Sequence, residues 1–225
     1  GERAAVTAIV GARGLKALPK RATREMLGLT PGEFRTLARL NTPRKIQDFL
    51  DAIPQNFEPD GDTVLSVREV LAQRRAHCIE GAVVAACALW INGEPPLLMD
   101  LTAKRDYDHE ITLFRRNGAW GAFSKTNAVY LRYREPVYRT LRELAMSYFH
   151  EYSNKRHQRT LRTYSKPFDL RRVDPKLWVS GKDAWEVAYR VCDIPHYNLI
   201  TPRQEKTLIA RPKIEREGSK LLQYP

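Results

Sequence analysis

Apolar positions in the first third of the chain recur at helical spacing. Residues 43–53 carry one apolar stripe, and Thr42 with Pro43 ahead of it is typical of a helix start. Thr30 and Ser66 each stand three residues before a glutamate, which is the spacing of a capping box. The pattern therefore predicts a series of short, capped amphipathic helices before residue 75.

The stretch "AHCIEGAVVAACALW" (76–90) has a different pattern. From Ile79 to Ile91 only Glu80 is charged, and a helix that is apolar on all sides lies buried in its domain. Cys78 stands at the polar head of this predicted helix, and Gly93 follows its end. We therefore expect a core helix that begins at a cysteine.

Beyond residue 96 the apolar positions alternate, as they do in half-buried strands. Residues 97–101 form a short apolar run, and we expect strands over 109–114, 119–124 and 128–133, the first two joined in a hairpin at Asn117-Gly118. Pro136 is expected to open an amphipathic helix, 150–175 to be loop and short helix, and 183–192 to form a last helix. This order predicts an α+β fold with the cysteine-led helix packed on a small antiparallel sheet and helices at its flanks.

The length of 225 residues suits one large domain with additional segments. We expect a basic helical N-terminal arm over 1–41, a core over 42–135, and a helical C-terminal extension over 136–225 packed on the core. No apolar stretch reaches the ~18 residues that a membrane span needs, and we expect a cytoplasmic protein. Three cysteines make a poor disulfide framework and the histidines follow no zinc spacing, so neither metal nor cofactor is expected.

The net charge of +12 is unevenly distributed. Residues 51–100 hold three arginines against eight acids, so the rest of the chain is strongly basic. A basic surface attracts nucleic acid or an acidic partner, and the alternative is a set of solvated helix faces.

A cysteine at the start of a buried helix is a candidate nucleophile. The helix N-terminus stabilises a thiolate, and a histidine from another element completes the activation. His109 begins the first strand predicted after the helix and is expected to face the helix start, while the next strand ends at Ser124 and Asn127 follows in the turn. A cysteine on an apolar helix can equally be a core residue, which describes Cys87.

These segments resemble a known family. The order "CIEGAVVAACALWINGEPPLL", "DHEITLF" and "GAWGAFSKTN" is similar to the papain-like core of the transglutaminase-like superfamily, in particular the bacterial cysteine peptidases, over about residues 42–127. The resemblance implies Cys78 as the nucleophile and His109 as general base and acid. The family places an aspartate four residues after the tryptophan, where this chain has Ser124, and Asn127 is the preferred alternative for the third position.

Five further residues are candidates around Cys78, and each has an ordinary structural alternative. Gln73 is either an oxyanion donor or a solvent-facing helix residue, and His77 is a base or a residue that caps or lines the site. Asp108 orients a histidine, binds a substrate cation or is solvated. Lys125 holds an anion or lies on the surface, and Trp120 lines the substrate site or belongs to the core.

The sequence thus leaves two classes of function. The first is cysteine-dependent acyl transfer on an amide or ester, acting on a protein, peptide or small amide through a thioester. The second is an inactive member of the same fold that binds nucleic acid or an acidic partner, for which the segment "SNKRHQRTLRTYSKPF" (153–168) supplies cations and aromatic residues.

Overall fold

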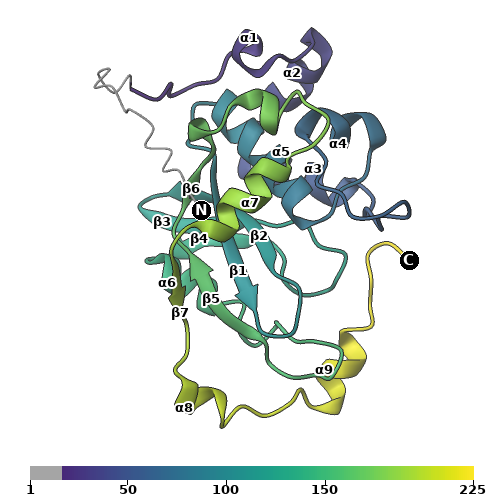
Figure 1. Cartoon of the computed structure of the whole chain (residues 1–225), viewed down its shortest axis with the longest axis vertical. Helices are drawn as coiled ribbons and strands as arrows, with labels where there is room; N and C mark the ends of the chain where they lie inside the picture. The colour runs from purple at the N-terminus through teal and green to yellow at the C-terminus, as the bar shows by residue number, and fades with distance from the viewer. Residues whose placement is uncertain (1–16) are drawn as a thin grey trace, which may run out of the picture.

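The computed structural model describes residues 17–225, and Figure 1 shows their arrangement. Most helices gather at one end, the sheet lies in the middle, and loops with two short helices form the other end (Figure 1). The helices are α1 (Arg24–Leu27), α2 (Pro31–Ala38), α3 (Pro43–Ala52), α4 (Val67–Gln73), α5 (Cys78–Ile91), α6 (Leu141–Met146), α7 (Trp185–Asp193), α8 (Pro202–Glu205) and α9 (Lys213–Gly218).

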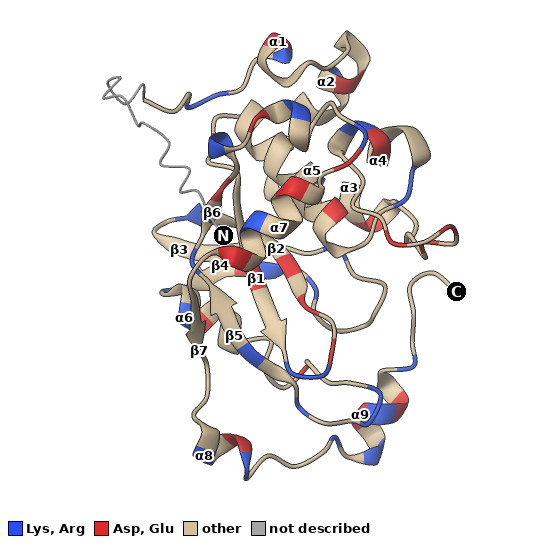
Figure 2. Cartoon of the chain, viewed as in Figure 1, with Lys and Arg blue, Asp and Glu red and all other residues tan. Residues whose placement is uncertain are grey.

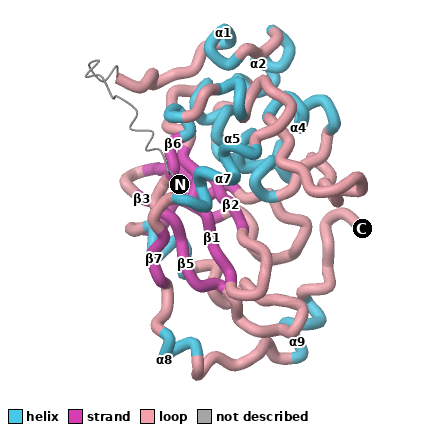
Figure 3. The backbone as a smooth tube through the Cα atoms, viewed as in Figure 1, coloured by secondary structure: helices cyan, strands magenta, loops and turns pink. Residues whose placement is uncertain are grey.

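Within the described residues the strands form one seven-stranded antiparallel sheet (Figure 3). Its order is β4-β3-β2-β1-β5-β7, and the short β6 also pairs with β1. The strands are β1 (Leu97–Ala103), β2 (His109–Arg116), β3 (Ala119–Phe123), β4 (Arg134–Tyr138), β5 (Leu161–Ser165), β6 (Phe168–Asp169) and β7 (His196–Asn198). The mixture of helices with an open antiparallel sheet agrees with the predicted α+β class.

Each face of the sheet is covered by its own apolar core. Helix α5 packs on one face. Leu98, Phe114 and Phe123 of the sheet contribute to the apolar core around this helix, here called the helical core. Met99 and Ile111 point to the other face, where they meet the residues of α6. Because neighbouring residues of a strand point to opposite faces, each side chain of β1 and β2 belongs to one core or the other. This alternation decides which side chains can reach the start of α5.

Local signals placed most of the early helices correctly. Thr30, Thr42 and Ser66 accept hydrogen bonds from backbone N–H groups three residues on, and each precedes its helix. The hairpin also forms as predicted, with Asn117 and Gly118 at φ of 50° and 80° in the turn between β2 and β3. These are the left-handed conformations that such a two-residue turn requires.

The predicted N-terminal arm needs correction. Residues 1–16 lie outside the described part of the chain, but residues 17–41 are not an arm. Leu27 and Leu37 are fully buried in the core around α5, and the backbone N–H of Ala22 donates to Trp90 O. The first two helices are therefore part of the helical layer.

The predicted C-terminal half is also corrected. The strand predicted over 128–133 forms later in the chain, as β4. Pro136 lies inside β4, which is an edge strand, and a residue without a backbone N–H is tolerated there. Helix α6 begins later, at Leu141, with Thr140 as its cap. Residues 136–225 are not only helical, because β5, β6 and β7 pair with β1 or with each other in the same sheet as the predicted core.

Among the described residues, no helix combines the length and the apolar character needed to cross a bilayer.

Candidate functional site

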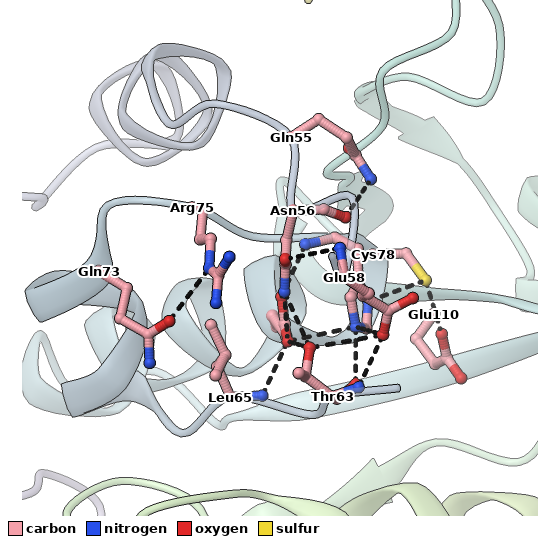
Figure 4. A network of polar contacts seen from close by, with 11 residues as sticks. Gln55, Asn56, Glu58, Thr63, Leu65, Gln73, Arg75, Cys78 and Glu110 are labelled. Atoms are coloured by element: carbon pink, nitrogen blue, oxygen red, sulfur yellow. Dashed lines mark hydrogen bonds and ion pairs between the residues drawn. The ribbon is translucent and has the colours of Figure 1, made fainter. Parts of the chain in front are cut away.

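Cys78 is a half-buried residue at the first position of α5, and its thiol lies against the start of β2. The Sγ–H donates to Glu110 Oε2 across 3.1 Å, and His77 Nδ1 lies 4.0 Å from the sulfur. Figure 4 shows the Cys78 sulfur and the Glu110 carboxyl pointing toward one another from α5 and β2. The sequence offered no reason to single out Glu110, yet this residue is the nearest polar partner of the thiol.

The environment keeps the Cys78 thiol protonated. Burial, together with the neighbouring negative charge of Glu110, raises the pKa of Cys78 well above its usual value. The backbone N–H groups of Glu110 and Ile79 donate toward the sulfur and act in the opposite direction. Burial also raises the pKa of Glu110 itself, which makes this carboxylate a stronger base.

His77 is held in a fixed orientation beside the thiol. Its Nε2–H donates to Thr63 O at 2.9 Å, with Glu80 Oε1 at 3.2 Å and Glu58 Oε1 at 3.4 Å. Three oxygens around Nε2 fix a proton on that nitrogen, so Nδ1 is the atom presented to Cys78. Burial lowers the pKa of His77, but the hydrogen bond and charge of Glu80 outweigh it and the net pKa is raised.

Glu80 is the anchor of this network, and its side chain is fully buried. It accepts hydrogen bonds from four donors on two segments, namely Asn56 Nδ2, Thr63 Oγ1 and Leu65 N on the 55–65 segment and His77 N at the start of α5. Burial alone would raise the pKa of Glu80, but the hydrogen bonds and charge of His77, with the other donors, lower it to about 2. Figure 4 shows these contacts converging from the 55–65 segment and the start of α5.

A second acid lies beside Glu110 on the same face of the sheet. Asp100 pairs with Glu110 across β1 and β2, so their side chains are neighbours. Asp100 Oδ2 lies 2.9 Å from His196 Nε2 on β7, and the buried Oδ1 has no hydrogen-bond partner within the described residues. His196 Nδ1–H donates to Ile194 O, so one proton is shared between His196 Nε2 and Asp100.

This pairing makes stability depend on pH. Burial and the charge of Glu110 raise the pKa of Asp100 to about 7 from an ordinary value of 3.8. The folded state therefore binds a proton that the unfolded state releases, and the stability from Asp100 is lost as pH rises from about 4 to about 7. We expect Asp100→Asn to stabilise the protein relative to wild type by about 2 kcal/mol more at pH 8 than at pH 5.

Urea unfolding of both proteins at the two pH values measures this difference. The exposed Asp48→Asn variant is the control. An unchanged difference between wild type and Asp100→Asn at the two pH values would contradict the shared proton.

His109 does not reach Cys78, which corrects the expected pairing. His109 and Ile111 are two residues apart on β2 and therefore point to the same face of the sheet. This is the face opposite α5. There its Nε2–H donates to Ser124 Oγ at 2.7 Å, and Ser124 in turn donates to Leu131 O. Burial lowers the pKa of His109 to about 4, so this is a neutral, buried histidine.

Asn127 is not a third member of a triad with Cys78. Its side-chain amide pairs with the backbone of Tyr224, donating to the carbonyl at 2.8 Å and accepting from the N–H at 2.7 Å. The residue thus fixes the C-terminal segment to the loop after β3. Of the two candidates for the third position, the structure brings Ser124 to His109 and takes Asn127 elsewhere.

Gln73, Asp108 and Trp120 each contact residues other than Cys78. Gln73 is exposed and hydrogen-bonds Glu69, which is the solvent-facing alternative, and exposed Asp108 accepts from Ala103 N. Half-buried Trp120 stacks under Arg115 at 4.8 Å.

Lys125 is not a surface residue. It is fully buried, donates to Ile53 O at 2.6 Å, and burial lowers the pKa of its ammonium group to about 8. Its Cβ occupies the space next to Gly81, one turn into α5, where a side chain on that glycine would overlap it at 2.3 Å. Lys125 therefore requires the glycine at this position.

Neither the known protein-family models nor the curated proteins match this chain. The described residues also contain no group of three or more His, Cys, Asp or Glu side chains placed to hold a metal ion.

Proposed function

We propose that this protein is a cysteine-dependent acyl transferase or hydrolase in which Cys78 attacks an amide or ester carbonyl. The observation that carries the proposal is the 3.1 Å contact between the Cys78 thiol and the Glu110 carboxylate at the N-terminus of a buried helix. A thiol paired with a base of raised pKa is the arrangement that general-base activation of a nucleophile requires. Both residues are half-buried.

The first step transfers the thiol proton to Glu110 as the sulfur bonds to the carbonyl carbon. The carbonyl electrons move to the oxygen, and the backbone N–H groups at the start of α5 would donate to the developing oxyanion. His77, held by Glu80, contributes positive charge 4.0 Å from the sulfur when it is protonated. The net rise in its pKa favours that form.

The second step releases the leaving group. The Glu110 carboxyl returns its proton to the leaving nitrogen or oxygen as the bond to carbon breaks and a Cys78 thioester remains. Water or an amine then attacks the thioester and Glu110 accepts its proton. As the bond between carbon and sulfur breaks, Glu110 passes this proton to the leaving sulfur and the Cys78 thiol is regenerated. Glu110 thus serves as base and acid in turn, the role that the sequence had suggested for His109.

Turnover of small activated substrates tests this proposal. A panel of p-nitrophenyl esters and p-nitroanilides should be hydrolysed by wild type and by Cys87→Ser and Cys192→Ser, while Cys78→Ser should lose at least about 100-fold of the rate. Cys87 is fully buried and Cys192 exposed, so the two controls bracket the exposure of Cys78. Equal rates for Cys78→Ser and the controls would overturn the proposal.

A further inference from the structure

A hollow of about 730 Å³ lies at the end of the sheet where β1 leads into β2. It is formed by the loop between β1 and β2 together with the loop before β5. The residues that line it are Arg105, Asp106, Tyr107, Asn154, Lys155, Arg156 and Gln158. Its volume lies within the range of roughly 300–1,000 Å³ that small-molecule sites occupy.

Three cations in this hollow have no protein partner. The side chains of Arg105, Lys155 and Arg156 are exposed, and within residues 17–225 none of them forms a hydrogen bond or ion pair with another residue. The one acid in the lining, Asp106, already accepts hydrogen bonds from Thr160 Oγ1 and Tyr107 N. The hollow is therefore positive, and its cations are available to a ligand.

An aromatic ring stands in the same hollow. The side chain of Tyr107 is 86% exposed, although its backbone carbonyl is fixed by the hydroxyl of buried Tyr152. The loop is thus anchored while the ring faces solvent. A large exposed aromatic beside unpaired cations is the combination that stacks on a base and holds its phosphates.

The positive surface continues beyond the hollow. A second hollow of about 180 Å³ shares Arg105 and Gln158 with the first and adds Lys104, Arg159 and Arg162. Glu205 pairs with Lys104 at 2.6 Å and with Arg162 at 3.4 Å, so the unpaired cations are concentrated at the first hollow. Figure 2 shows Lys and Arg along the loop at this end of β1.

We propose that this hollow binds single-stranded nucleic acid, with one base on the Tyr107 ring and the flanking phosphates on Arg105, Lys155 and Arg156. An acidic protein would use the same cations but gains less from an exposed ring, so the stacking surface favours the nucleic acid. The segment 153–168 mixes cations and aromatic residues in the sequence. Of this segment, Asn154, Lys155, Arg156 and Gln158 line the hollow. The inference does not depend on the chemistry of Cys78.

Fluorescence anisotropy with labelled single-stranded RNA and DNA 12-mers tests the proposal. The triple variant Arg105→Gln, Lys155→Gln, Arg156→Gln should bind at least ten-fold more weakly and lower the slope of log affinity against log salt by about two. Tyr107→Ala should weaken binding at least about five-fold and leave that slope unchanged. Cys78→Ser should bind as wild type does.

The matched control is Arg35→Gln, Arg172→Gln, Lys182→Gln, which removes the same charge from exposed positions elsewhere. Equal losses in the two triple variants would overturn the proposal, since binding would then follow net charge alone. Tighter binding of a labelled poly-glutamate peptide than of either oligonucleotide would also overturn it and identify an acidic protein as the ligand. Tyr107→Ala is a single change on an exposed side chain, so it tests the site even if the triple variant folds poorly.

Discussion

Replacing Glu80 by glutamine is expected to destabilise the fold by about 3 kcal/mol, because the change removes a buried charge from donors arranged around it. An amide has one acceptor oxygen where the carboxylate has two, and its NH₂ group would face the donors of Asn56 and Leu65. Urea unfolding at pH 7 measures the loss. The exposed Glu135→Gln variant is the control and should differ little from wild type.

The lowered pKa of Glu80 also predicts how acid affects the stability of the fold. The pKa of Glu80 is about 2 in the folded state, below its ordinary value of 4.5, so its contribution is present above about pH 4.5 and is lost as pH falls toward 2. The difference in stability between wild type and Glu80→Gln should therefore shrink between pH 5 and pH 3. A difference that stays constant over this range would show that Glu80 is not held as a carboxylate by the fold.

Replacing Glu110 by glutamine should separate two properties of Cys78. Removing the charge at 3.1 Å lowers the pKa of the thiol, so alkylation of Cys78 by iodoacetamide at pH 7 is expected to rise about ten-fold. Acyl transfer should instead fall by about 10²–10⁴, because the variant has no group to accept and return the proton. Peptide mapping of the alkylated protein follows the first property, and ester turnover follows the second.

These opposite changes are the distinguishing result. A purely structural role for Glu110 would move both rates in the same direction, and a spectator role would move neither. His109→Gln serves as a comparison, because its side chain contacts Ser124 on the far face of the sheet and should leave the alkylation rate of Cys78 unchanged.

The position of Cys78 could be predicted from the sequence because its signal is local. A long apolar run fixes a buried helix, and the change from polar to apolar residues fixes its start at residue 78. The capped helices and the Asn117-Gly118 hairpin follow for the same reason. Each depends on residues a few positions apart.

The partner of Cys78 could not be predicted in the same way. His109 and Glu110 are adjacent on one strand, and a one-residue difference in register decides which of them faces α5. The alternation of side chains along β2 indicates part of the arrangement. Phe114 and Glu110 point to the same face of the sheet, and Phe114 packs in the core around α5. The resemblance drew attention to the histidine, although the structure turns its ring away.

Two other features depend on contacts between residues that are far apart in the chain. They are the position of Asp100 beside Glu110 and the strands of the C-terminal half. Asp100 meets His196 across 96 residues, and no spacing in the sequence connects them. Strand β5 has a weak pattern because its three central residues, Arg162, Thr163 and Tyr164, are all half-buried and do not alternate between buried and exposed. Residues 161–165 therefore resemble the basic loop around them when only the sequence is considered.

Mass spectrometric location of a trapped acyl group tests the central claim most directly. Wild type is mixed with a p-nitrophenyl ester, quenched in acid within the first turnover, and digested for peptide mapping. The account predicts a thioester on Cys78 that is absent in Cys78→Ser and forms more slowly in Glu110→Gln. An acyl group found on Cys192, or turnover with no acyl group on Cys78, would contradict it.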